Sequence, residues 1–141
     1  MDRKAEAQWF GDLKSGKGTM AVGSGAFSGP YSFISRFEGS KDTNPEELLG
    51  AAHAACFSMA LSNTLAQRGK PVTSVTTTAV VTADKGAAGF SINKIALTTR
   101  GVVPGLSAEE FKAVAEETKT GCIVSRALAA VPMTLDAELA G

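Results

Sequence analysis

The hydrophobic and polar positions of this chain follow two kinds of spacing, and each kind predicts an element. Alternating or β-branched segments, typical of strands with one buried face, lie between turns rich in glycine or polar residues. They are the six segments 5–9, 19–22, 31–37, 72–83, 90–103 and 133–139. The alternation of 90–103 slips between Ile92 and Ile95, which predicts a β-bulge. Residues 84–89 are expected to form the hairpin loop before that strand.

A long helix is predicted over 45–68. Asn44 is a good N-cap residue, Pro45 suits the first helical position, and Gly69 is a typical end signal. From 48 to 61 the segment has almost no polar face, and a helix that is apolar all round is buried on all sides. A chain of 141 residues can hardly surround such a helix by itself, so we expect a partner subunit to cover part of it.

Two shorter helices are predicted in the last third of the chain. The first covers 107–121, where Ser107 and Glu110 have the spacing of a capping box. The second covers 122–131 and stops before a proline. The length of the chain suits a single domain over 1–141.

Charge and length exclude several classes of function. Lys+Arg 14 balances Asp+Glu 14, which argues against the basic surface that binds nucleic acid or acidic membranes. The longest strongly apolar stretch, from 48 to 61, is 14 residues long. A membrane-spanning helix needs about 20, so we expect no membrane span. Residues 1–6 contain acids and no apolar core, unlike a secretory signal, so we expect a cytoplasmic protein with reduced thiols.

The two cysteines are candidates for chemistry. Cys56 lies in the middle of the long predicted helix, where apolar burial raises the pKa of a thiol unless a cation reaches it. Cys122 is expected at the start of a helix, where backbone N–H groups and the helix dipole favour the thiolate. Local electrostatics therefore favour Cys122 as the nucleophile. For each cysteine, the alternative is a purely structural role.

His53, the only histidine, lies one turn before Cys56 on the same side of the predicted helix. That spacing suggests a Cys–His pair, and the simpler interpretation is a core or interface histidine. Two cysteines and one histidine without the spacings of zinc sites predict no metal, and no sequence motif predicts a cofactor.

Arg36 and Glu47 are the charged candidates. If 31–37 is a strand, Arg36 shares a face with Glu38 and either pairs with it in solvent or acts as a fixed cation that favours a thiolate. Glu47 lies nine positions before Cys56 on the predicted helix, which puts the two side chains on opposite sides. Glu47 therefore either caps the helix or works in a site across a dimer interface.

Several stretches of the chain resemble one protein family. The longest are RFEG at 36–39 and TNPEELLGAAHAACFSMAL at 43–61. Shorter matches are WxGD at 9–12, KIAL at 94–97 and GCxVS at 121–125, where x is a position outside the match. Together these stretches closely resemble the osmotically inducible protein C (OsmC) family over essentially the whole chain. The AAHAACFSMAL segment is similar to the OsmC branch rather than to the sister organic hydroperoxide resistance branch.

The resemblance implies an OsmC-like fold of the α+β class, with antiparallel sheets around a long central helix, in an intertwined homodimer with two sites at its interface. It also implies a thiol-dependent peroxidase that reduces organic hydroperoxides, and hydrogen peroxide less well, in oxidative and osmotic stress defence. By motif position, Cys56 matches the peroxidatic cysteine and Cys122 the resolving cysteine. Arg36 matches the arginine that activates the thiol, and Glu47 matches the carboxylate that holds this arginine.

The reaction that the resemblance implies proceeds through a sulfenic acid on Cys56, which condenses with Cys122 to a disulfide. An external dithiol, lipoyl-type or another small dithiol, then reduces the disulfide. This assignment reverses the ranking of the cysteines by local electrostatics. One residue departs from the family pattern, because Ile123 stands where the family commonly has proline. Ile123 restores a backbone N–H and should loosen the start of the helix.

Two other functions remain open at the level of sequence. One is a peroxide-sensing or small-molecule-binding dimer whose cysteines react without turnover. The other is a cysteine hydrolase built on Cys56 and His53. A hydrolase of this kind would lack a third group to orient the histidine.

Overall fold

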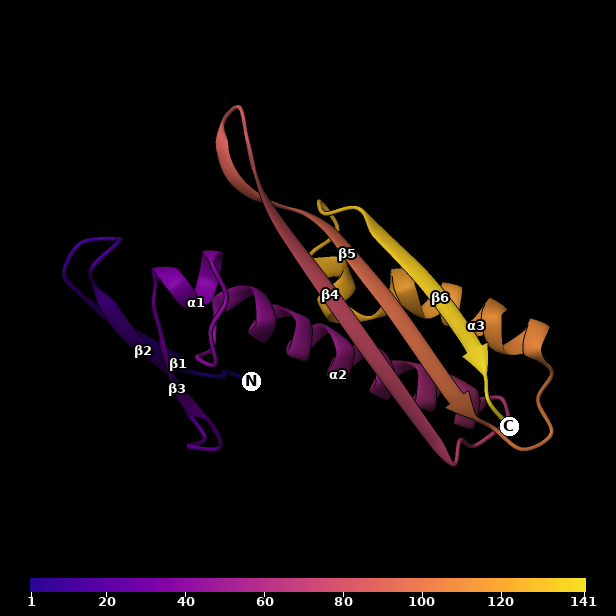
Figure 1. Ribbon diagram of the computed structural model, residues 1–141. Helices are drawn as coiled ribbons and strands as arrows, with labels where there is room; N and C mark the ends of the chain where they lie inside the picture. Colours follow the sequence, from indigo (N-terminus) through magenta and orange to yellow (C-terminus); the bar gives the residue numbers. More distant parts are fainter. The chain divides into compact units, whose positions relative to one another are not determined.

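A computed structural model describes residues 1–141 of the protein. The chain divides into two compact units, Met1–Leu48 and Leu49–Gly141. Each unit contains its own three-stranded sheet, and helices are present in both (Figure 1). The fold is therefore α+β, as the resemblance to the OsmC family implies.

The first unit is an antiparallel meander followed by a short helix. Its strands pair in the order β1-β2-β3, and the helix after them is α1. Their bounds are β1 Ala5–Phe10, β2 Lys17–Val22, β3 Ser28–Tyr31 and α1 Phe33–Phe37. The Trp9 ring lies 5.3 Å from the Tyr31 ring between centroids, and its Nε1 donates to the carbonyl of Gly11 at 3.0 Å. One aromatic residue thus joins β1, β3 and the turn after β1.

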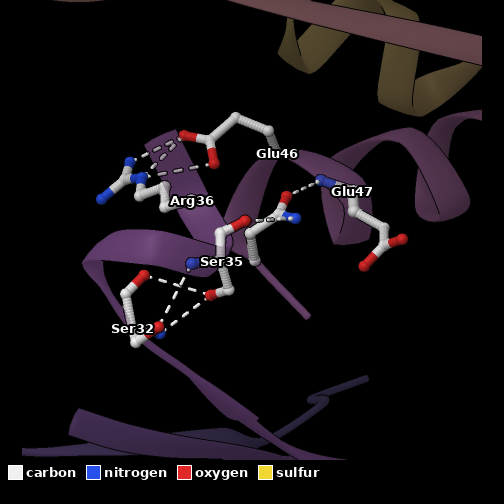
Figure 2. A network of polar contacts seen from close by, with 6 residues as sticks. Ser32, Ser35, Arg36, Glu46 and Glu47 are labelled. Atoms are coloured by element: carbon white, nitrogen blue, oxygen red, sulfur yellow. Dashed lines mark hydrogen bonds and ion pairs between the residues drawn. The ribbon is translucent and has the colours of Figure 1, made fainter. Parts of the chain in front are cut away.

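The predicted strand over 31–37 is wrong, because the chain turns into α1 directly after β3. The Ser32 hydroxyl accepts from the Ser35 backbone N–H at 3.1 Å, and the Ser35 hydroxyl accepts from the Ser32 N–H at 2.8 Å. These reciprocal bonds form a capping box with serine in the place usually taken by Glu or Gln (Figure 2). Local side-chain bonds to the backbone outweigh the alternation of apolar residues here.

The long helix α2, Pro45–Gln67, confirms the prediction over 45–68. Its first turn is capped by Asn44, whose side-chain oxygen accepts from the Glu47 N–H at 2.8 Å. At the other end Gly69 has φ +75°, a left-handed conformation that favours glycine and ends the helix. The helix begins in the first unit and continues in the second.

The second unit contains a mixed sheet. Strands β4 (Ser74–Gly86) and β5 (Gly89–Val102) form an antiparallel hairpin, and β6 (Met133–Leu139) pairs with β5 in parallel. The expectation of antiparallel sheets is wrong for β5 and β6. Between them the chain passes through α3 (Ala108–Gly121) and α4 (Ile123–Ala127), and such a crossover returns the chain in its original direction.

The β4–β5 hairpin carries the predicted bulge. Thr82 pairs with Lys94 and Ala83 pairs with Ile92, which leaves Asn93 as the extra residue. The loop is shorter than predicted, since the strands continue to Gly86 and Gly89. The predicted capping box of α3 is confirmed, but α4 ends well before the predicted limit at 131.

The core of the second unit lies between the sheet and its helices, and α2 and α3 both lie behind the sheet in Figure 1. From α2 the core contains Phe57, Leu61 and Leu65, and from β5 it contains Ile95 and Leu97. The other members are Val103, Phe111, Val114, Ala115, Cys122 and Ala137. The α2 residues in this core are spaced four apart, so only one face of the apolar helix is covered within the chain.

By length and composition alone, α2 is apolar enough to cross a membrane, with a mean hydropathy of 1.2 over 18 residues, 28% of them buried. This differs from the expectation based on the 14-residue apolar stretch. Core helices of proteins outside membranes meet the same criterion. One face of α2 belongs to such a core, so the criterion alone does not indicate a membrane protein.

Gly101 offers a direct test of this core. A Cβ at this position would lie 2.4 Å from Cε2 of Phe111. We expect Gly101→Ala to lower the free energy of unfolding by about 1–3 kcal/mol through overpacking. The measurement is urea unfolding followed by circular dichroism.

Gly86→Ala, on the same hairpin, is the matched control, because the nearest atom to its added Cβ lies 3.9 Å away. Adding Phe111→Leu to Gly101→Ala should recover part of the loss. Equal effects of the two glycine substitutions would contradict the packing described here.

Candidate functional site

The two cysteine sulfurs lie in contact within the second unit. Cys56 is in the middle of α2 and partly exposed, whereas Cys122 lies between α3 and α4 and is 2% exposed. Their Sγ atoms are 2.9 Å apart, and both residues are free thiols. The contact joins residues 66 positions apart in the sequence.

The position of Cys122 follows from the break between the two helices. Its backbone N–H still bonds the Thr118 carbonyl at 2.9 Å, which ends α3. Its own φ −57° and ψ 132° are extended, and its carbonyl accepts from the Arg126 N–H at 2.9 Å in α4. Cys122 is therefore the N-cap residue of α4, in agreement with the prediction that it starts a helix.

The surroundings of the two sulfurs push their pKa values in opposite directions. Burial, followed by the hydrogen bond with Cys122, raises the pKa of the Cys56 thiol, although backbone N–H groups of Val124 and Ile123 favour its thiolate. Burial also acts against ionisation of Cys122, but hydrogen bonds from Cys56 and Ser125 outweigh it and lower the pKa of Cys122. Local electrostatics thus favour Cys122 as the thiolate in the reduced pair, as the sequence predicts.

His53 is buried and does not form the suggested pair with Cys56. Its Nε2 lies 2.7 Å from the Ser125 hydroxyl oxygen, while its Nδ1 is buried without a hydrogen-bond partner. Burial lowers the pKa of this imidazole, so it is neutral at neutral pH. Ser125, in the first turn of α4, therefore contacts His53 and also favours the thiolate of Cys122, the residue that caps this helix. Sequence reasoning did not single it out, because nothing in the sequence brings it to His53.

The charged candidates lie in the first unit. Arg36, in α1, binds Glu46 through two nitrogens, with Nε–Oε1 at 2.9 Å and Nη2–Oε1 at 2.8 Å (Figure 2). The Arg36 side chain is 40% exposed and that of Glu46 12%. Asn44 holds the two elements together, because its Nδ2 donates to the Ser35 carbonyl at 3.3 Å. Within this chain, Glu46 therefore holds the Arg36 guanidinium, whereas the family motif assigns this role to the next residue, Glu47.

Glu47 lies on another side of the helix from Glu46. Figure 2 shows its carboxylate pointing away from Arg36. It accepts from the Thr43 hydroxyl at 3.0 Å, and its backbone N–H donates to the Asn44 cap. Within one chain, Glu47 thus belongs to the N-terminal cap of α2.

A pocket of about 230 Å³ lies beside Arg36 in the first unit. Its lining is mainly aromatic and consists of Trp9, Leu13, Tyr31, Ser32, Phe33, Arg36 and Phe37. In the second unit, Cys122 and Glu117 line a separate cavity of about 240 Å³, and the Glu117 carboxylate is bound by Arg68. No group of three or more His, Cys, Asp or Glu side chains is arranged to hold a metal ion.

The sulfur pair can change between dithiol and disulfide with little movement. A disulfide bond is about 2.05 Å long, so the sulfurs at 2.9 Å need to approach by less than about 1 Å. Two thiols held in this way can reduce an oxidant by two electrons and store the oxidation as a disulfide.

Comparisons with known proteins identify the family of this chain. The family model of OsmC-like proteins matches residues 38–136. A protein of Escherichia coli K12 named peroxiredoxin OsmC is 53% identical over 97% of this chain and 96% of its own length.

Solved structures show the same fold at lower identity. An organic hydroperoxide resistance protein OsmC from Legionella pneumophila has a TM-score of 0.76 at 23% identity, over 96% of each chain. An organic hydroperoxide resistance protein from Elizabethkingia anophelis has a TM-score of 0.77 at 22% identity, also over 96% of each chain. Since the family match and the curated relative extend across both units, this chain belongs to the OsmC family.

Proposed function

We propose that this chain is a thiol-dependent peroxidase that reduces organic hydroperoxides and, less efficiently, hydrogen peroxide, in oxidative and osmotic stress defence. The observation that carries the proposal is the 2.9 Å contact between the Cys56 and Cys122 sulfurs. The names of the relatives, peroxiredoxin OsmC and organic hydroperoxide resistance protein, support the same reaction.

In the proposed first step, the Cys56 thiolate attacks one oxygen of the peroxide. A sulfur–oxygen bond forms, the oxygen–oxygen bond breaks, and the alkoxide leaves and takes up a proton. Cys56 becomes a sulfenic acid. The exposure of the sulfurs supports Cys56 as the attacking residue, because Cys56 is partly exposed and Cys122 is only 2% exposed.

A cation is needed to favour the thiolate on Cys56, since burial raises the pKa of its thiol. We propose Arg36 for this role, following the family motif. Its Nε and Nη2 bind Glu46, and its guanidinium lies over the Phe37 ring. A guanidinium held in this way can stabilise the thiolate and then the departing alkoxide. Glu46 holds Arg36 within the chain, and we propose that Glu47 acts across a dimer interface.

In the proposed second step, Cys122 attacks the Cys56 sulfenic acid. A disulfide forms and water leaves. A lipoyl-type or other small dithiol then reduces the disulfide by thiol–disulfide exchange. The aromatic pocket beside Arg36 suits an alkyl group better than hydrogen peroxide, which supports organic hydroperoxides as the substrate class.

The open face of α2 supports a homodimer. Ala51, Ala52, Ala55 and Met59 are exposed in a single chain, and Met59 reaches 76% exposure. Uncovered apolar faces of this kind mark interaction surfaces. We propose that a second copy covers this face, that each copy is a single OsmC-like domain over 1–141, and that the dimer is a soluble cytoplasmic protein without nucleic-acid or membrane partners.

The roles of the cysteines are tested by peroxide consumption. With cumene hydroperoxide and excess dithiol, we expect Cys56→Ser to abolish turnover and Cys122→Ser to permit a single rapid reduction. If Cys122→Ser abolishes even the first reduction, the ranking by local electrostatics is right and the assigned roles are wrong. Stoichiometric oxidation of the wild type that no dithiol reverses would favour a peroxide sensor instead.

Arg36 and its carboxylates have a separate test. We expect Arg36→Ala to lower kcat/KM for cumene hydroperoxide roughly hundredfold, because a positioned charge is lost from the departing oxygen. Glu46→Gln and Glu47→Gln should each lower it by about tenfold if both carboxylates orient the guanidinium. Glu109→Gln in the first turn of α3 is the matched control and should leave kcat/KM unchanged. An unchanged rate in Glu47→Gln would limit Glu47 to capping α2.

The proposed dimer is tested by sedimentation. Wild-type protein should sediment at twice the chain mass of 14.4 kDa. Met59→Glu should raise the dissociation constant at least tenfold, because it would place a charge in an apolar interface. Lys112→Glu, an exposed change on α3, is the control. A stable wild-type monomer would contradict the dimer and the role proposed for Glu47.

A further inference from the structure

The Cys122 sulfur is linked to a buried histidine that the proposed reaction does not use. His53 on α2 and Ser125 on α4 are 0% and 3% exposed, and His53 Nε2 lies 2.7 Å from Ser125 Oγ. Ser125 lies three residues after Cys122, in the first turn of the helix that Cys122 caps, and its backbone N–H and side chain both favour the Cys122 thiolate. His53 and Ser125 thus adjoin Cys122, whose sulfur lies 2.9 Å from that of Cys56.

The unpaired nitrogen of His53 decides where the ring carries its hydrogen. Nδ1 is buried and has no partner. Buried N–H groups without an acceptor are rarer in proteins than buried acceptors without a donor. The hydrogen therefore belongs on Nε2, which donates it to Ser125 Oγ. A neutral ring carries only one such hydrogen, and burial, which lowers the pKa of His53, keeps the ring neutral.

Because His53 Nε2 donates to the Ser125 oxygen, the hydrogen of the Ser125 hydroxyl is free to bond another acceptor. Ser125 Oγ has accepted from His53, and a hydroxyl carries one hydrogen of its own. The acceptor that we assign to it is the Cys122 sulfur, at the N-cap of the same helix, because the Ser125 side chain helps to lower the pKa of Cys122. Hydrogen bonds to an ionised group are stronger than those to a neutral one, so this chain of donors favours a negative charge on the Cys122 sulfur.

We propose that His53 and Ser125 are positioning residues that hold Cys122 as the attacking thiolate in the step that closes the Cys56–Cys122 disulfide. This inference rests on the proposed function, since it concerns the second half of the peroxidase cycle. It assigns the low-pKa sulfur to resolution rather than to peroxide attack, which reconciles the local electrostatics with the roles taken from the family motif.

The step balances without any further reactant. Cys122 loses its proton, and its sulfur attacks the sulfur of the Cys56 sulfenic acid. The S–S bond forms, the S–O bond breaks, and the hydroxide that leaves takes up a proton to give water. The Nε2–H of His53 and the hydroxyl of Ser125 keep their hydrogens throughout, so no imidazolium forms in the core.

A kinetic experiment separates the two halves of the cycle. Reduced wild type, His53→Leu, His53→Gln and Ser125→Ala are mixed with cumene hydroperoxide, and the sulfenic acid and the disulfide are followed by rapid quench and mass spectrometry. We expect disulfide closure to slow about tenfold in His53→Leu and Ser125→Ala, with sulfenic acid formation unchanged. His53→Gln should recover part of the rate, because its side-chain amide can donate where Nε2 does.

Thr99→Val is the control for a lost buried hydroxyl, since Thr99 is 0% exposed and bonds only Thr77 among the side chains. It should leave closure unchanged. Equal slowing in Thr99→Val, or a slower first step in His53→Leu, would mean that the substitutions loosen the core and would overturn the inference.

A second experiment needs no peroxide, so it separates this inference from the proposed function. In Cys56→Ser, Cys122 is the only thiol, and its titration is read from the ultraviolet absorbance of the thiolate. Adding Ser125→Ala or His53→Leu should raise the pKa of Cys122. The charged groups at the cavity that Cys122 lines, Glu117 and its partner Arg68, are unchanged in these variants. An unchanged pKa would overturn the inference even if the wild type consumes peroxide.

The tautomer provides a third readout. His53 is the only histidine, so the nitrogen resonances of the imidazole are assigned without ambiguity. We expect the hydrogen on Nε2 in the reduced wild type. If the hydrogen is on Nδ1, the Ser125 hydroxyl must donate its only hydrogen to His53 Nε2 and has none to donate to Cys122. That result would overturn the inference.

Discussion

The packing of α2 against the sheet is the constraint on which the sulfur pair depends. Phe57, Leu61 and Leu65 bury one row of the helix, and Cys56 precedes the first of them. The orientation of that row therefore also fixes the side of the helix on which Cys56 lies. The break between α3 and α4 then brings Cys122 to it from the crossover. Close packing of apolar side chains thus positions the two sulfurs 2.9 Å apart.

Signals that act within a few residues made much of the fold predictable. The caps of α2 and α3 and the bulge at Asn93 were all predicted from neighbouring residues. The helix α1 was missed because serine at Ser35 replaces the usual Glu or Gln of a capping box. The parallel pairing of β5 and β6 was missed because it depends on where α3 and α4 return the chain, which no local pattern encodes.

The candidate site was predictable only in part. Local signals placed Cys122 at a helix start, but its contact with Cys56 spans 66 positions and came only from the family motif. The link from His53 to Ser125 spans 72 positions and had no signal at all. Glu46 and Glu47 differ by about 100° around the helix, so only the position of α1 decides which one meets Arg36.

The sulfurs touch before any oxidant arrives, which also bears on chemical damage to the protein. A sulfenic acid on Cys56 would form beside a thiol already held in place, and such neighbours react as if at very high concentration. A second peroxide, present in solution at low concentration, would compete poorly with that thiol. Oxidation of Cys56 to the sulfinic acid, an irreversible product, would therefore be suppressed. In the proposed peroxidase, the contact that favours disulfide closure would thus also protect Cys56 from excess peroxide.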